Sequence, residues 1–270
     1  AASRVKANDA KSYHHKNLSA LPGMRFPSCT CSGQDHPGPN RKTARSAPEL
    51  DIFEIQVQGD ESYASQSYQV APYDENYVWF SKKGSYKLYD TDITRRNSWS
   101  GNPYQEAMSC TTRLPHWPFF DASTKPKPIR FGVEWDPDFE NTGNGHITWY
   151  MDGKPTWTLK DAALSGDENT EISRRIFPKE PMSIIMNLGI SSGFQPIEWD
   201  DLEFPAHMAF DYVRVYQKHG TQKRISCDPD NYPTADYIQR NLELYYNSNL
   251  TSYLNSSHEA WPKNSLMNKC

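Results

Sequence analysis

The sequence predicts an all-β protein, an antiparallel β-sandwich or barrel with one helix near the C-terminus. Short segments of apolar or alternating apolar and polar residues recur along the chain, and clusters of turn-forming residues such as Asp136-Pro137-Asp138 separate them. No long helical pattern lies between these segments, which is typical of sandwiches and barrels. The 270 residues are enough for one such domain with a sizeable core.

Seven segments carry the strand pattern. They are residues 49–58, 77–80, 107–113, 129–135, 146–151, 182–188 and 208–216. The dipeptide Asp152-Gly153 has strand-like residues on both sides, and this predicts a two-residue hairpin turn.

The two ends of the chain differ from its middle. Residues 1–48 are polar, basic and rich in Pro and Gly, and we expect a loop-rich N-terminal segment of the domain there. Residues 49–226 form the expected sandwich. In residues 227–270 Thr234 can cap a helix, and we expect this helix and the tail to pack on the same domain. The apolar face of the helix consists of Tyr237, Ile238, Leu242 and Tyr245.

The composition excludes several classes of protein. The net charge is −4, and the acidic and basic residues are interspersed, so the basic footprint of a nucleic-acid-binding protein is absent from the sequence. No apolar run approaches the roughly 18 residues of a membrane span. We expect a membrane attachment only through an N-terminal anchor outside these residues.

Glycosylation sequons and cysteines indicate an oxidising compartment. Acceptor sequons begin at Asn17, Asn249 and Asn255. The five cysteines match no zinc spacing, because Cys29-Thr30-Cys31 lacks the two-residue gap and has no partner pair. We therefore expect disulfides rather than a metal site, with no pairing fixed by the sequence.

The stretch from Glu49 to Glu54 contains three acidic residues and is the most informative part of the sequence. In a strand Glu49 and Asp51 point to the same face, whereas Glu54, five residues from Glu49, would point to the other. A one-residue β-bulge at Ile52-Phe53, with Phe53 as the extra residue, would return Glu54 to the face of the other two. A solvated strand face could also carry such acids, but three like charges close together would destabilise it.

Glycoside cleavage gives a chemical reason for this crowding. One carboxylate attacks the anomeric carbon, and a second acid with a raised pKa protonates the leaving oxygen. Two glutamates that lean together over a concave sheet can reach the separation of about 5–5.5 Å that retaining enzymes use. A third carboxylate between them can hold the nucleophile and help separate the two pKa values.

The segment Ser46-Ala47-Pro48-Glu49-Leu50-Asp51-Ile52-Phe53-Glu54 resembles the active-site strand of glycoside hydrolase family 16, and in particular its fungal β-1,6-glucan synthesis-associated branch. Further stretches from about residue 28 to the C-terminus resemble the same branch in the same order. They include Ser28-Cys29-Thr30-Cys31, Ser65 to Asp74, Asn187 to Ser191, Trp199 to Pro205, Asp211 to Gln217 and Tyr232 to Ile238. The family places a long run of strands before its active-site strand, whereas here only 48 residues precede Glu49. We therefore expect the first strands of the sandwich to be missing.

The resemblance implies a concanavalin A-like jelly roll with a substrate cleft on its concave sheet. By position, Glu49 would be the nucleophile, Asp51 the assisting carboxylate and Glu54 the general acid/base. The partner would be a β-glucan polysaccharide or oligosaccharide, with no cofactor. The resemblance also implies a type II membrane protein in the parent form, located in the secretory pathway lumen, at the plasma membrane or in the cell wall.

Four further residues are candidates for sugar binding: Trp135, Trp149, Asn187 and Trp199. A tryptophan face suits stacking on a sugar ring, although each of these tryptophans would equally suit a buried core position. The leading functional hypothesis is a β-glucan hydrolase or transglycosylase of cell-wall assembly. The alternatives are a non-catalytic β-glucan-binding or assembly factor on the same fold, and a structural protein with a glycan-decorated surface.

Overall fold

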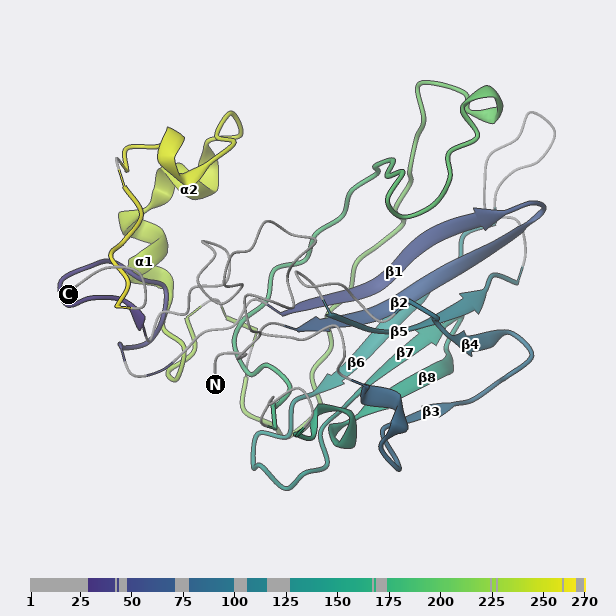
Figure 1. The fold of residues 1–270 in the computed structure, drawn as a ribbon, viewed down its shortest axis with the longest axis horizontal. Helices are drawn as coiled ribbons and strands as arrows, with labels where there is room; N and C mark the ends of the chain where they lie inside the picture. The colour runs from purple at the N-terminus through teal and green to yellow at the C-terminus, as the bar shows by residue number, and fades with distance from the viewer. Residues whose placement is uncertain are drawn as a thin grey trace.

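The computed structural model describes residues 29–41, 43, 48–70, 78–99, 106–115, 127–166, 168, 174–223, 225–226, 228–258, 260–265 and 270. These residues form two four-stranded antiparallel sheets that pack face to face (Figure 1). The predicted all-β sandwich is therefore confirmed. Within the described part of the chain, no helix combines the length and the apolar composition needed to cross a membrane.

The first sheet contains the predicted acidic strand at its edge. Its strands are β1 (Glu49–Gln58), β2 (Glu61–Val70), β5 (Glu106–Arg113) and β4 (Thr94–Arg96), in the order β1-β2-β5-β4. Only β1 and β5 match predicted strands. The prediction missed β2 because several of its inward positions are Ser62, Ala64 and Gln66, so the strand lacks a strong apolar alternation.

The second sheet contains β3 (Tyr86–Leu88), β8 (Lys154–Lys160), β7 (His146–Met151) and β6 (Phe131–Asp136), in the order β3-β8-β7-β6. Asp152 and Gly153 form the turn between β7 and β8, with φ angles of 49° and 80°. Positive φ at both central residues is the geometry that twists a hairpin correctly. The predicted hairpin is confirmed.

The core lies between the two sheets and is built around aromatic rings. Trp149 and Trp157 stack with a centroid separation of 4.2 Å and an interplanar angle of 3°, and both side chains are fully buried. Phe53 of β1 stacks on Phe131 of β6 at 4.3 Å and joins the edges of the two sheets. The apolar area that these rings bury is the main stabilising contribution to the sandwich.

Two predicted strands are not strands in the structure. Residues 182–188 and 208–216 carry no strand, because they have no ladder partner among the described residues. Their apolar side chains are exposed, for example Ile185 at 82% and Tyr216 at 79%. Residues 78–80, the described part of the predicted strand 77–80, also contain no strand; Trp79 instead begins the 3-10 helix η5 (Trp79–Ser81). The other short helices of the middle region are η6 (Asp161–Leu164) and η7 (Trp199–Asp201).

The C-terminal helix is interrupted. It consists of α1 (Ala235–Arg240) and α2 (Leu242–Tyr246), followed by η8 (Tyr253–Asn255). The break falls at Asn241, whose buried side chain donates to Asp35 and lies 2.8 Å from His258. The Thr234 side chain does not cap α1; the Asp228 carboxylate instead accepts from the backbone N–H groups of Thr234 and Ala235.

These helices pack against residues from the other end of the described chain. Asp35 accepts a hydrogen bond from Arg240 at 2.9 Å, Thr30 forms a β-bridge with Asn264, and a disulfide joins Cys31 to Cys270. In Figure 1 α1 and α2 lie apart from the two sheets. The helical unit is thus fastened by its own contacts with residues 29–41.

Candidate active site

A β-bulge in β1 brings the three acidic side chains to one face of the sheet. Asp51 pairs with Ser67 and Glu54 with Ser65, so Ile52 and Phe53 together oppose the single residue Gln66. The predicted one-residue bulge is confirmed, but the extra residue differs from the prediction. Phe53 keeps its place in the core, whereas Ile52 is exposed at 37%. Ile52 is therefore the residue outside the alternation.

The side chain of Asp51 is held by the neighbouring strand. The Ser67 hydroxyl donates to its Oδ2 at 2.5 Å, and the Gln69 amide donates to the same oxygen at 2.7 Å. Because both hydrogen bonds hold the same oxygen, they fix the orientation of the Asp51 side chain. The side chain of Asp51 is thus held in place beside those of Glu49 and Glu54.

Glu54 has a raised pKa of about 7. The largest cause is desolvation by the surrounding protein, and the charges of Asp51 and Glu49 raise the pKa further. Part of the Glu54 side chain is exposed to solvent. The surrounding protein and the neighbouring negative charges nevertheless make its ionised form less stable. At neutral pH a large fraction of Glu54 is therefore protonated and able to donate a proton.

Trp149 supports the bulge from inside the core. Its indole Nε1 donates to the backbone carbonyl of Asp51 at 2.8 Å. The Thr156 hydroxyl lies 3.1 Å from the carbonyl of Trp149 and 2.7 Å from Oε1 of the buried Gln66. This chain of polar contacts connects the bulge to the second sheet. These contacts have no periodic signal in the sequence, because the residues that make them stand at ordinary strand positions.

The structure places the four sugar-binding candidates in different surroundings. The expectation for Trp149 was wrong, because its side chain is fully buried and stacked on Trp157. Trp135 is partly buried and packs against the main core. Asn187 is exposed and lines the hollow that the carboxylates share, whereas Trp199, 62% exposed in η7, does not line it. Trp135, Asn187 and Trp199 stay predictions.

The carboxylates line a broad, open hollow that extends over much of the molecule, from Thr30 to Asn264, and residues 179–217 contribute much of its lining. Two contacts fasten this segment to the open edge of β1. The Gln56 side chain donates to the carbonyl of Phe194 at 3.2 Å, and Gln195 Oε1 accepts from the backbone N–H of Val57 at 2.8 Å. Gln195 thereby satisfies a backbone donor that an edge strand otherwise leaves to solvent.

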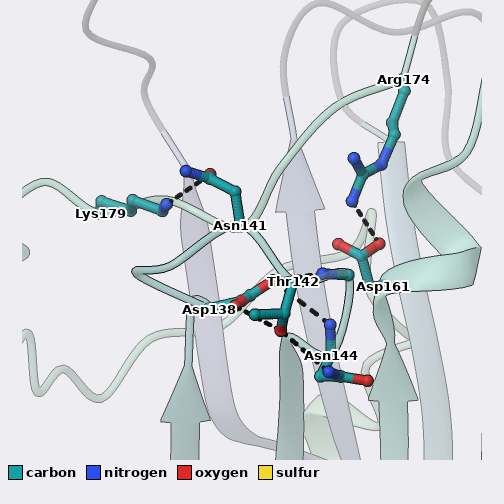
Figure 2. Close-up of polar contacts among 8 residues, drawn as sticks. Asp138, Asn141, Thr142, Asn144, Asp161, Arg174 and Lys179 are labelled. Carbon is teal, nitrogen blue, oxygen red and sulfur yellow. Dashed lines mark hydrogen bonds and ion pairs between the residues drawn. The ribbon is translucent and has the colours of Figure 1, made fainter.

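The start of this segment is fixed by the loop between β6 and β7 (Figure 2). Asp138 accepts from the Thr142 hydroxyl at 2.9 Å and from the backbone N–H of Gly143 at 2.6 Å. The closed loop presents Asn141, whose side-chain oxygen accepts from Lys179 Nζ at 2.8 Å. Figure 2 also shows the ion pair of Arg174 with Asp161, at 2.6 Å, which ties the preceding residues to η6.

Two of the three sequon asparagines lie on the described surface. Asn249 and Asn255 are exposed, and Asn17 lies outside the described residues. Among the residues that the structure describes, no group of three or more His, Cys, Asp or Glu side chains is arranged to hold a metal ion.

Comparisons with known proteins agree with the resemblance seen in the sequence. Residues 5–270 match the family model described as "Beta-glucan synthesis-associated protein SKN1/KRE6/Sbg1". The chain is 39% identical over 258 residues to the β-glucan synthesis-associated protein KRE6 of Candida albicans, covering 93% of this chain and 33% of that protein. It is 38% identical over 251 residues to SKN1 of Candida albicans, covering 93% of this chain and 32% of that protein.

It is also 37% identical over 256 residues to KRE6 of Saccharomyces cerevisiae, covering 94% of this chain and 34% of that protein. The chain thus spans about a third of the length of these curated relatives. No solved structure matches it. With a family model that covers nearly its whole length, the chain belongs to the SKN1/KRE6/Sbg1 family of β-glucan synthesis-associated proteins.

Proposed function

We propose that this chain carries the catalytic face of a retaining β-glucan glycosidase or transglycosylase that acts in the synthesis of cell-wall β-glucan, including β-1,6-glucan. The observation that carries the proposal is the bulge of β1. It gathers Glu49, Asp51 and Glu54 on one open sheet face, where Glu54 has a pKa of about 7. The names of the relatives, which associate them with β-glucan synthesis, support a glucan as the substrate.

In the first step the Glu49 carboxylate attacks the anomeric carbon while protonated Glu54 donates its proton to the glycosidic oxygen. The bond to the leaving sugar breaks, and a glycosyl ester forms on Glu49. The fixed charge of Asp51 favours the proton on Glu54 before this step.

In the second step Glu54, now a carboxylate, takes a proton from the incoming hydroxyl. The oxygen of that hydroxyl attacks the anomeric carbon, and the ester bond to Glu49 breaks. When the hydroxyl belongs to water the glycosyl ester is hydrolysed, and when it belongs to another sugar the glycosyl group is transferred to that sugar. Both outcomes restore free Glu49 with retained configuration at the anomeric carbon. We place this reaction in the secretory pathway, at the plasma membrane or in the cell wall.

The test is product analysis on β-1,3- and β-1,6-gluco-oligosaccharides. The unaltered chain is compared with Glu49→Gln and with Glu168→Gln, a control at an exposed glutamate outside the hollow. All three proteins must first show an unfolding transition. We expect new oligosaccharides from the unaltered chain and from the control, and a loss of several orders of magnitude with Glu49→Gln.

The ratio of longer to shorter products then separates transfer from hydrolysis. If folded, unaltered protein binds glucan but leaves the sugars unchanged, catalysis is refuted for this chain. The same result would favour a binding or assembly factor on this fold.

A further inference from the structure

The sheet face beside the carboxylates is floored by small hydroxyl side chains. Asp51 pairs with Ser67, and Ser67 pairs with Ser109 on β5, so these three form one row across three strands. Glu54 begins a parallel row through Ser65, which pairs with Thr111 of β5. The serines of both rows line the same hollow as the carboxylates. Small polar side chains leave room above the sheet and offer hydrogen bonds there.

Two buried polar atoms on this floor have no hydrogen-bond partner within the described part of the chain. They are the hydroxyl oxygen of Ser109, whose residue is 2% exposed, and Oε1 of Gln69, whose residue is 8% exposed. A buried polar atom without a partner costs about 1–3 kcal/mol. Such atoms in the lining of a hollow favour a ligand with many hydroxyl groups.

The row through Ser109 leads to Trp99, which follows β4. The backbone N–H of Asn97 donates to the carbonyl of Ser109 at 3.1 Å, and the Asn97 side chain accepts from the N–H of Trp99 at 3.1 Å. Asn97 thus connects the backbone of Trp99 to Ser109, the last residue of the row. Trp99 is 44% exposed and lines the hollow.

An exposed indole that lines the same hollow as a polar floor suits the apolar face of a sugar ring. Strands in a sheet lie about 4.8 Å apart, so the three spacings from β1 to the chain after β4 amount to roughly 14 Å. That distance is longer than one sugar ring. A ring on Trp99 would therefore be separated from the bond that is cleaved by at least one further sugar.

We propose that Trp99, with Ser109, forms a distal glucosyl-binding subsite, and that a linear β-glucan crosses the strands from the carboxylates, past Gln69, to Trp99. This inference rests on the proposed function for its substrate class, but it makes a separate claim about chain length. The sugar hydroxyls supply partners for the Ser109 and Gln69 oxygens, and Trp99 stacks on a ring. Short oligosaccharides that occupy only the carboxylate end do not reach Trp99.

The test measures affinity by calorimetry for a glucan disaccharide, which cannot span both ends of this path, and for a heptasaccharide of the same linkage. Each of the two linkages is assayed separately. All proteins carry Glu49→Gln so that the sugar is not consumed. Trp99→Ala is compared with Tyr246→Ala, a control at an exposed aromatic residue of α2 outside this hollow.

We expect Trp99→Ala to weaken heptasaccharide binding about three- to tenfold and disaccharide binding less than twofold. Tyr246→Ala changes neither affinity. A second variant, Ser109→Ala, removes the unpartnered hydroxyl, and we expect it too to weaken only the heptasaccharide.

Equal affinities for both sugar lengths, or an unchanged heptasaccharide affinity in Trp99→Ala, would overturn the subsite. If the protein binds oligosaccharides of neither linkage, the subsite is overturned as well. Cleavage by the protein with Glu49 intact is assayed in parallel. Cleavage without a Trp99 effect leaves the proposed function standing, whereas a Trp99 effect without cleavage leaves the subsite standing and refutes catalysis.

Discussion

Replacing Glu54 by glutamine removes the carboxyl whose pKa is raised to about 7 by its surroundings and by the charges of Asp51 and Glu49. Glutamine has the shape of the protonated acid and never ionises. We therefore expect Glu54→Gln to unfold with the same free energy as the unaltered protein at pH 4. Above pH 7 we expect the variant to be more stable.

The sign follows from proton binding. Between the ordinary glutamate pKa of 4.5 and the folded value of about 7, the folded protein holds the Glu54 proton and the unfolded chain releases it. The free energy of unfolding therefore falls as the pH rises through this window and is constant above it. A shift of this size corresponds to about 3 kcal/mol at 1.36 kcal/mol per pKa unit. Because the side chain retains exposed surface, solvent screening reduces the effect, and we expect a gain on the order of 1 kcal/mol.

The assay is urea unfolding at five pH values from 4 to 8. The quantity measured is the shift in the urea concentration at the midpoint, provided that the slope of the free energy against urea concentration is unchanged. Glu168→Gln serves as the control at an exposed glutamate outside the acidic cluster. A stability difference for Glu54→Gln that is the same at all five values would refute the reasoning. A difference that grows towards low pH would refute it as well.

Two further predictions follow from the core and from the surface. Trp149→Phe keeps a stacked ring but removes the donor to the Asp51 carbonyl, whereas Trp157→Phe removes an Nε1 that has no partner among the described residues. We therefore expect Trp149→Phe to lower the free energy of unfolding by about 1–3 kcal/mol more than Trp157→Phe does. Equal losses in urea unfolding would show that this hydrogen bond does not contribute to stability. The exposed apolar side chains around Ile185 and Tyr216 should make the chain associate as its concentration rises, as measured by sedimentation; a cooperative melt of a monomer at all concentrations would contradict this.

The strand prediction succeeded where neighbouring side chains alternate in polarity. β1 and β7 were found with their observed bounds, and the sharp turn at Asp152-Gly153 followed from its residue types. β2 was missed because its inward positions include Ser62 and Gln66. Gln66 is nevertheless fully buried, since its side-chain oxygen accepts hydrogen bonds from threonines of both sheets. Such a cross-sheet contact depends on tertiary structure and leaves no periodic signal.

The acidic site, too, could be predicted from the sequence only in part. The odd spacing of Glu49 and Glu54 required a bulge if both were to share a face, and the structure has that bulge. The sequence could not decide which of Ile52 and Phe53 turns outwards, because both are apolar and the choice depends on the contact of Phe53 with Phe131. Whether Trp149 faces sugar or core also depended on the partner sheet, which local sequence does not reveal.

The disulfide between Cys31 and Cys270 spans 239 positions of the sequence, and the whole sandwich lies within the loop that it closes. A protease that cuts the chain once anywhere inside this loop therefore produces two fragments that stay covalently joined. On a non-reducing gel such nicked protein migrates as one species, and the fragments separate only after reduction. Limited proteolysis of this protein thus has to be analysed with and without a reducing agent before any segment is judged resistant to cleavage.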